Sequence, residues 1–134
     1  MDVAATSVLI FLRDDSQCWW QRRAWDDDSH PGRLDFAAGG GIEAGETPAA
    51  AAARELEEEL GIADLPLRPL GRMKLDGEVC ELFDAPLPAR WRLGPEVAAL
   101  LPLPLAALTA LAADELHPQL ADWLGRQEPA AHNC

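Results

Sequence analysis

Three glutamates near the middle of the chain have the spacing of a metal-binding helix face. Glu55, Glu58 and Glu59 stand three and four residues apart, so a helix places them on one side. Like charges at this spacing repel by about 0.2–0.5 kcal/mol per pair. A divalent cation reverses this penalty, because Mg²⁺ and Mn²⁺ prefer clustered carboxylate oxygens. The spacing therefore indicates a hard-cation site, with a solvated acidic face as the alternative.

The helix that must carry these glutamates is delimited by its own sequence. Thr47 is a suitable N-cap, Pro48 fits a first turn that needs no amide donor, and Gly61 favours a left-handed stop. Strong helix formers fill the interval between them. The helical repeat predicts an apolar stripe of four residues that faces the core: Ala49, Ala53, Leu56 and Leu60.

Further fixed residues flank this helix. The segment from Gly40 to Ile62 matches the pattern G-x5-E-x7-R-E-U-x-E-E-x-G-U, in which U is a bulky aliphatic residue. The matching residues are Gly40, Glu46, Arg54, Glu55, Leu56, Glu58, Glu59, Gly61 and Ile62. This segment resembles the Nudix box, the signature of the Nudix hydrolase family. The resemblance implies an α+β (α/β layered) Nudix fold, with a mixed β-sheet sandwiched between helices.

The resemblance also implies roles for individual residues. Glu58 and Glu59 match metal-ligating positions, and Glu55 matches a position used as ligand or base. Arg54 and Glu46 match a pair that gives structural support by orienting the helix. The expected metal ligands, including a backbone carbonyl at the glycine, are Gly40, Glu55, Glu58 and Glu59. With Mg²⁺ or Mn²⁺ as cofactor, the implied reaction is hydrolysis of a phosphoanhydride by a metal-activated water.

Residues outside the box complete the expected site. Arg22 and Arg23 are candidates for binding substrate phosphate, but strand alternation directs at most one of them into a given cleft. Glu96, late in the chain, is a candidate catalytic base or metal ligand. Three tryptophans could stack on a nucleobase, although core packing is the favoured interpretation: Trp19, Trp20 and Trp91.

The remaining motifs are similar to the isopentenyl-diphosphate-isomerase-like branch of the family. They are Gln21-Arg22-Arg23, Pro31-Gly32, Leu34-Asp35, Ala38-Gly39-Gly40 and Asp76-Gly77-Glu78-Val79-Cys80. That isomerase, however, needs a cysteine just before the box and a histidine metal cage, and residues 36–41 contain neither. Hydrolysis of a nucleoside diphosphate derivative is therefore favoured. The isomerase and a non-catalytic nucleotide-binding module are the alternatives.

Length and charge limit the class of partner. With 134 residues we expect one Nudix domain over residues 1–134, with a disordered tail at 126–134. The net charge of −12 argues against binding a nucleic-acid polymer, so the expected partner is a small nucleotide or diphosphate. The longest apolar stretch contains Pro102 and Pro104, which disfavours a membrane span. Free cysteines and the lack of a recognisable signal peptide indicate the cytoplasm, and a homodimer is compatible with the sequence.

Hydrophobic patterning predicts strands followed by terminal helices. The expected strands are residues 4–12, 17–24, 34–38, 67–75, 78–85 and 96–103, the first two forming a hairpin. Besides the central helix, two more helices are expected at residues 105–112 and 116–124.

Overall fold

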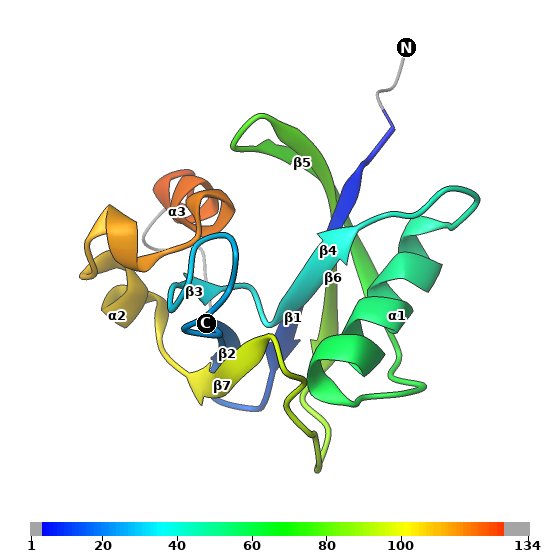
Figure 1. The fold of residues 1–134 in the computed structure, drawn as a ribbon, viewed down its shortest axis with the longest axis horizontal. Helices are drawn as coiled ribbons and strands as arrows, with labels where there is room; N and C mark the ends of the chain where they lie inside the picture. Colours follow the sequence, from blue (N-terminus) through cyan, green and yellow to red (C-terminus); the bar gives the residue numbers. More distant parts are fainter. Residues whose placement is uncertain (1–3, 128–134) are drawn as a thin grey trace.

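A seven-stranded mixed sheet separates α1 from α2 and α3 in the computed structural model, which describes residues 4–127 (Figure 1). Its strands are β1 Ser7–Arg13, β2 Cys18–Arg23, β3 Leu34–Asp35, β4 Ala38–Gly41, β5 Arg68–Leu75, β6 Glu78–Pro86 and β7 Val97–Pro102. The helices are α1 Pro48–Leu60, α2 Leu105–Thr109, the short 3-10 helix η1 Ala113–Glu115 and α3 Pro118–Gly125. The predicted fold class, a mixed sheet between helices, is confirmed.

Strand β1 lies at the centre of the sheet and has three partners. It runs parallel to β6 along its whole length, and it is antiparallel to β2 at Leu12 and Arg13. On the side of Leu12 away from the turn, β1 and β2 separate, and residues 34–41 pair with both strands. Strand β3 pairs with β2, and β4 pairs with the first part of β1. The single strand expected at 34–38 is therefore two strands, because the chain changes partner at Phe36 and Ala37.

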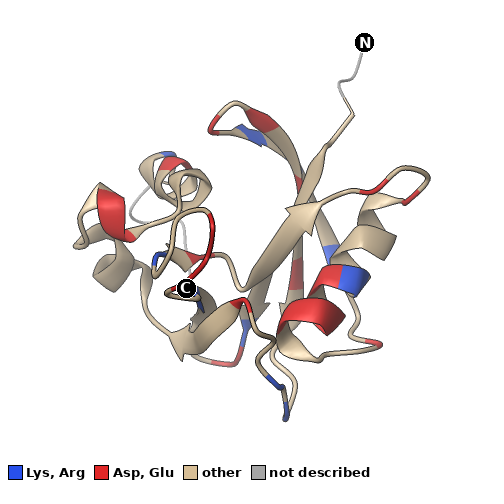
Figure 2. Ribbon diagram, viewed as in Figure 1, with Lys and Arg blue, Asp and Glu red and all other residues tan. Residues whose placement is uncertain are grey.

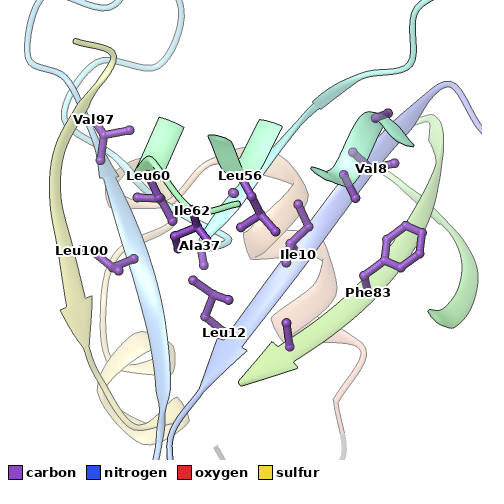
Figure 3. Packing of buried hydrophobic residues seen from close by; sticks show 14 residues of the cluster. Val8, Ile10, Leu12, Ala37, Leu56, Leu60, Ile62, Phe83, Val97 and Leu100 are labelled. Carbon is purple, nitrogen blue, oxygen red and sulfur yellow. The ribbon is translucent and has the colours of Figure 1, made fainter. Parts of the chain in front are cut away.

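Both faces of β1 are buried, which explains why its sequence is a continuous apolar run. Figure 3 shows Ile10 and Leu12 of β1 packed beneath Leu56 and Leu60 of α1. On the other face, the core contains the aromatic side chains of Phe11, Trp20, Phe36 and Trp123, together with leucines from α2 and α3. The first core layer positions α1, the element that carries the expected metal ligands.

Helix α1 begins and ends where its sequence predicts. The Thr47 hydroxyl accepts a hydrogen bond from the Ala50 amide at 3.1 Å, and Gly61 has a left-handed φ of 63°. The predicted apolar stripe, however, is wrong in its first half: Ala49 and Ala53 are exposed. The buried residues are Ala51, Ala52, Leu56, Glu59 and Leu60.

This difference follows from the run of alanines at 49–53, which carries no information about which side faces the core. The buried face of α1 contains Glu59 itself, beside Leu56 and Leu60. The helix is thus turned so that part of its acidic side, which we expected to lie apart from the core side, packs against the sheet.

The terminal elements differ in detail from the prediction. Helix α2 ends at Thr109, and α3 begins only at Pro118 because Leu116 is extended and forms a bridge with Leu34. Of the tail expected to be disordered, Arg126 pairs with Asp122 at 2.8 Å, and residues 128–134 lie outside the described part of the chain.

The expectations about membrane-spanning segments and cysteines can be compared with the structure. Within residues 4–127, no helix has the length and apolar character that crossing a membrane requires. Cys80 is a buried free thiol, as expected, and Cys18 is fully buried on β2.

Candidate active site

Strand β4 and helix α1 approach each other closely at Gly40. A Cβ atom added at Gly40 would lie 2.5 Å from Oε1 and 2.6 Å from Cδ of Glu55, well inside van der Waals contact. The Glu55 side chain is only 12% exposed. A glycine is therefore required at position 40 for the Glu55 carboxylate to lie against the strand, and the structure brings these two predicted residues together.

Glu59 lies deeper in the same interface and is 9% exposed. Its Oε1 accepts a hydrogen bond of 2.7 Å from Nε2 of Gln21, which also donates to the Ala37 carbonyl at 2.9 Å. Burial raises the pKa of Glu59 well above its usual range, and the adjoining Glu55 and Asp35 raise it further, whereas the hydrogen bond from Gln21 lowers it. Glu59 is thus a buried carboxyl group whose ionised form, among the residues that the structure describes, is stabilised only through the hydrogen bond from Gln21.

The structure places Gln21 in the candidate site, against Glu59. From the sequence, Gln21 is noted only as part of the motif Gln21-Arg22-Arg23. It is 5% exposed, in the middle of β2. The available signal was its position, because an amide side chain at an inward-facing strand position must find a buried partner. The identity of that partner depends on the rotation of α1, which the sequence does not specify.

Arg54 connects the glutamates of α1 to the preceding loop. Its Nη1 donates to Glu55 Oε1 at 2.8 Å and lies 3.4 Å from Glu58 Oε2. Its Nε and Nη2 bind both carboxylate oxygens of Glu46 at 2.8 and 3.0 Å, and Nη2 also donates to the Gly41 carbonyl at 2.9 Å. The hydrogen bonds from Arg54 lower the pKa of Glu46 to about 2. In Figure 2, the basic (blue) segment of α1 lies directly beside acidic (red) segments of the same helix.

The third glutamate of the predicted cluster is turned toward solvent. The Glu58 side chain is 58% exposed, whereas Glu59 is buried close enough to Glu55 for Glu55 to raise its pKa. Consequently, no three His, Cys, Asp or Glu side chains converge on a metal-holding position within residues 4–127.

The donor set nevertheless fits a divalent cation. Two adjacent carboxylates, one of them buried, repel each other unless a proton or a cation lies between them. Glu58 lies near Glu55, because Arg54 Nη1 is 2.8 Å from Glu55 Oε1 and 3.4 Å from Glu58 Oε2. The residues that would hold the ion are thus Glu55, Glu58 and Glu59, beside the backbone of Gly40.

The two candidate phosphate-binding arginines lie on opposite faces of β2, as expected. Arg23 binds Asp35 at 3.0 Å and Asp27 at 3.2 Å, and Asp35 lies directly opposite Gln21 in the β2–β3 pairing. Arg23 therefore lies on the same side of the sheet as the Gln21–Glu59 contact. Arg22, on the opposite side, donates to the Gly32 carbonyl at 2.8 Å and lies over the Trp25 ring.

Glu96 is exposed just before β7. It lines a cavity of about 400 Å³ together with Arg23 and Asp27. The loop before it is fixed to the end of α1, because the Gly94 amide donates to the Glu59 carbonyl at 2.8 Å. Glu96 is thus placed beside Arg23, at the rim of the site.

The tryptophans serve mainly in packing. Trp20 is 1% exposed and donates its indole N–H to the Leu103 carbonyl, so it has no face open to a nucleobase. Trp19 and Trp91 pack edge to face with ring centroids 5.4 Å apart, and Trp19 donates to Asp14 at 2.8 Å. Core packing, the favoured interpretation, is confirmed for Trp20.

Comparison with known proteins agrees with the fold and the helix described above. The NUDIX domain family matches residues 3–125. The chain belongs to the Nudix family. An uncharacterised Nudix hydrolase of Pseudomonas aeruginosa is 44% identical over 95 residues, which cover 68% of this chain and 56% of that protein. Another, from Yersinia pestis, is 45% identical over 65 residues, or 48% of this chain and 36% of that protein. The chain thus matches about a third to somewhat over half of the length of these relatives.

Solved structures share the fold. The crystal structure of DR0079 from Deinococcus radiodurans has a TM-score of 0.77 and 26% identity, covering 93% of this chain and 86% of that one. The MutT protein from Methanosarcina mazei has a TM-score of 0.72 at 21% identity, covering 93% of this chain and 95% of that one.

Proposed function

We propose that this protein is a Mg²⁺- or Mn²⁺-dependent hydrolase that cleaves a phosphoanhydride bond of a nucleoside diphosphate linked to another moiety. The observation that supports this best is the burial of Glu59 on the same helix as Glu55, whose carboxylate lies against Gly40. Two ionised carboxylates in a mostly buried interface repel each other unless a proton or a cation lies between them. A divalent cation bound by them would offset their repulsion and could also accept phosphate oxygens as ligands.

The protein groups have distinct tasks in this proposal. When bound, the cation supplies charge neutralisation at phosphate oxygens and activation of a water. Glu55, Glu58 and Glu59 would hold the ion, and either Glu55 or Glu96 would accept the proton of the attacking water. Arg54 fixes Glu55 through its Nη1 contact and anchors the helix to Glu46.

Substrate phosphate is assigned to the Arg23 side of β2. Arg23 is paired with Asp35 and Asp27, so an incoming phosphate must compete with these carboxylates for the guanidinium. Arg22 lies on the other face, over Trp25, and is the weaker candidate. The cavity shared by Arg23 and Glu96 is large enough for part of a nucleotide, at about 400 Å³.

Two other functions are less well supported. Isomerisation of an allylic diphosphate needs two acid–base groups on opposite faces of the double bond, inside a dry pocket. The strand beside Glu55 offers only alanine and glycine at positions 37–41. A purely binding module has no need of the repelling Glu55–Glu59 pair, whereas a metal-dependent hydrolase does.

The hydrolase and the isomerase make opposite predictions for solvent isotope uptake. With Mg²⁺ and a panel of nucleoside diphosphate derivatives, we expect release of phosphate or a nucleotide product. With isopentenyl diphosphate in deuterated water, we expect no deuterium at carbon by NMR beyond the level of a Glu59→Gln variant. Deuterium uptake well above that control would establish the isomerase instead. A nucleotide that binds in calorimetry but is never cleaved would favour the binding module.

The same proposal includes the substrate class, the partners and the location of the protein. The substrate is a small nucleotide or diphosphate, neither a nucleic-acid polymer nor a membrane is a partner, and the protein acts in the cytoplasm. A single domain over residues 1–134 and a homodimer both stay predictions.

A further inference from the structure

We propose that Gln21 is a positioning residue for Glu59, and that it determines which carboxylate oxygen Glu59 offers to a cation. This inference rests on the proposed function, because it concerns the same metal-binding glutamates. Gln21 comes from β2 and Glu59 from α1, so their contact joins the sheet to the catalytic helix.

The hydrogen bonds fix the orientation of the Gln21 amide without ambiguity. Nε2 lies 2.9 Å from the Ala37 carbonyl and 2.7 Å from Glu59 Oε1, and both of these atoms are acceptors. Only the NH₂ end of the amide can bind two acceptors, so the reversed amide is excluded. Each N–H therefore has one partner, and the Ala37 carbonyl prevents the amide from rotating away from Glu59.

This arrangement has two consequences for Glu59. Its Oε1 is engaged by Gln21, so the other oxygen is the one left to Glu55 and to an ion. In addition, a neutral donor stabilises the carboxylate in a place where Gln21 and Glu59 are only 5% and 9% exposed. A second positive side chain here would compete with the metal, whereas an amide donor does not.

The experiment measures Mn²⁺ binding to the full chain, in the absence of substrate, by isothermal titration and by the EPR signal of free Mn²⁺. In Gln21→Met the shape is nearly kept and both donors are lost. The matched control is Gln119→Met, because Gln119 Nε2 also donates to a glutamate, Glu78 Oε1, at 2.8 Å and away from the catalytic helix. Circular dichroism and thermal melts establish that each variant is folded, and Gln21→Leu replaces Gln21→Met if the latter does not fold.

We expect the Kd for Mn²⁺ to rise about 10–100-fold in Gln21→Met, as for other residues that orient metal ligands, and to stay within about twofold in Gln119→Met. Wild-type affinity in a folded Gln21→Met variant would overturn the role of Gln21, as would equal weakening in Gln119→Met. Either of these two outcomes would leave the proposed function intact, provided that Glu59→Gln abolishes Mn²⁺ binding. A wild-type protein that binds no Mn²⁺, or a Glu59→Gln variant that binds it normally, would overturn the proposed function together with this inference.

Discussion

Glutamine in place of Glu59 or Glu58 is expected to lower the rate of phosphoanhydride hydrolysis by about 100-fold or more. Each substitution keeps the size of the side chain and removes the charge that holds the cation. A loss of this size corresponds to about 2.7 kcal/mol of transition-state stabilisation. The measurement is initial product release at saturating Mg²⁺, with the substrate identified from the nucleotide panel.

Glu57 provides the control on the same helix, because it is exposed and lies outside the Glu55–Glu59 contact. The Glu57→Gln variant should retain wild-type activity within about twofold, as expected for a surface change. If Glu58→Gln and Glu59→Gln were as active as Glu57→Gln on a proven substrate, the metal assignment would be wrong.

A single methyl group at Gly40 is expected to have an effect of similar size. The added Cβ would lie 2.5 Å from Glu55 Oε1, about 1 Å closer than ordinary contact allows. Because the atoms it meets are the end of a long side chain, the carboxylate must move while the strand remains in place. A displacement of about 1 Å in a catalytic group can cost about 100-fold in rate, so Gly40→Ala should lose about that much.

The neighbouring glycine is a close control for this prediction. A Cβ at Gly41 meets nothing nearer than the Thr6 carbonyl at 4.0 Å, so Gly41→Ala should have nearly wild-type activity and a similar melting temperature. The two variants differ only in which β4 glycine receives the methyl group. Equal rates in Gly40→Ala and Gly41→Ala would show that the position of the Glu55 carboxylate is unimportant.

The parts of this site that could be predicted from sequence are those determined by local chemistry. Helix α1 begins after Thr47 and ends before Gly61 because a capping hydroxyl and a left-handed glycine act within a few residues. The spacing of Glu55, Glu58 and Glu59 likewise follows from the helical repeat. The continuous apolar run of β1 predicts burial on both faces, as observed.

Other features depend on contacts between distant segments and could not be derived in that way. The alanines at 49–53 fit either side of α1, and the rotation of the helix is decided by its packing on β1 and β4. The pairing of Gln21 with Glu59 spans 38 positions and follows from that rotation. The division of residues 34–41 into β3 and β4 depends on where β1 and β2 diverge, which hydrophobic patterning does not report.

Metal dependence of the wild-type reaction tests the central claim most directly. The purified full chain is assayed on the nucleotide panel with Mg²⁺, then with excess EDTA, then with Mg²⁺ restored in excess over the chelator. We predict product release with Mg²⁺, loss of activity in EDTA and recovery on restoration, because Glu55, Glu58 and Glu59 act through a bound cation. Hydrolysis at an undiminished rate in EDTA would contradict the assignment of these carboxylates as metal ligands.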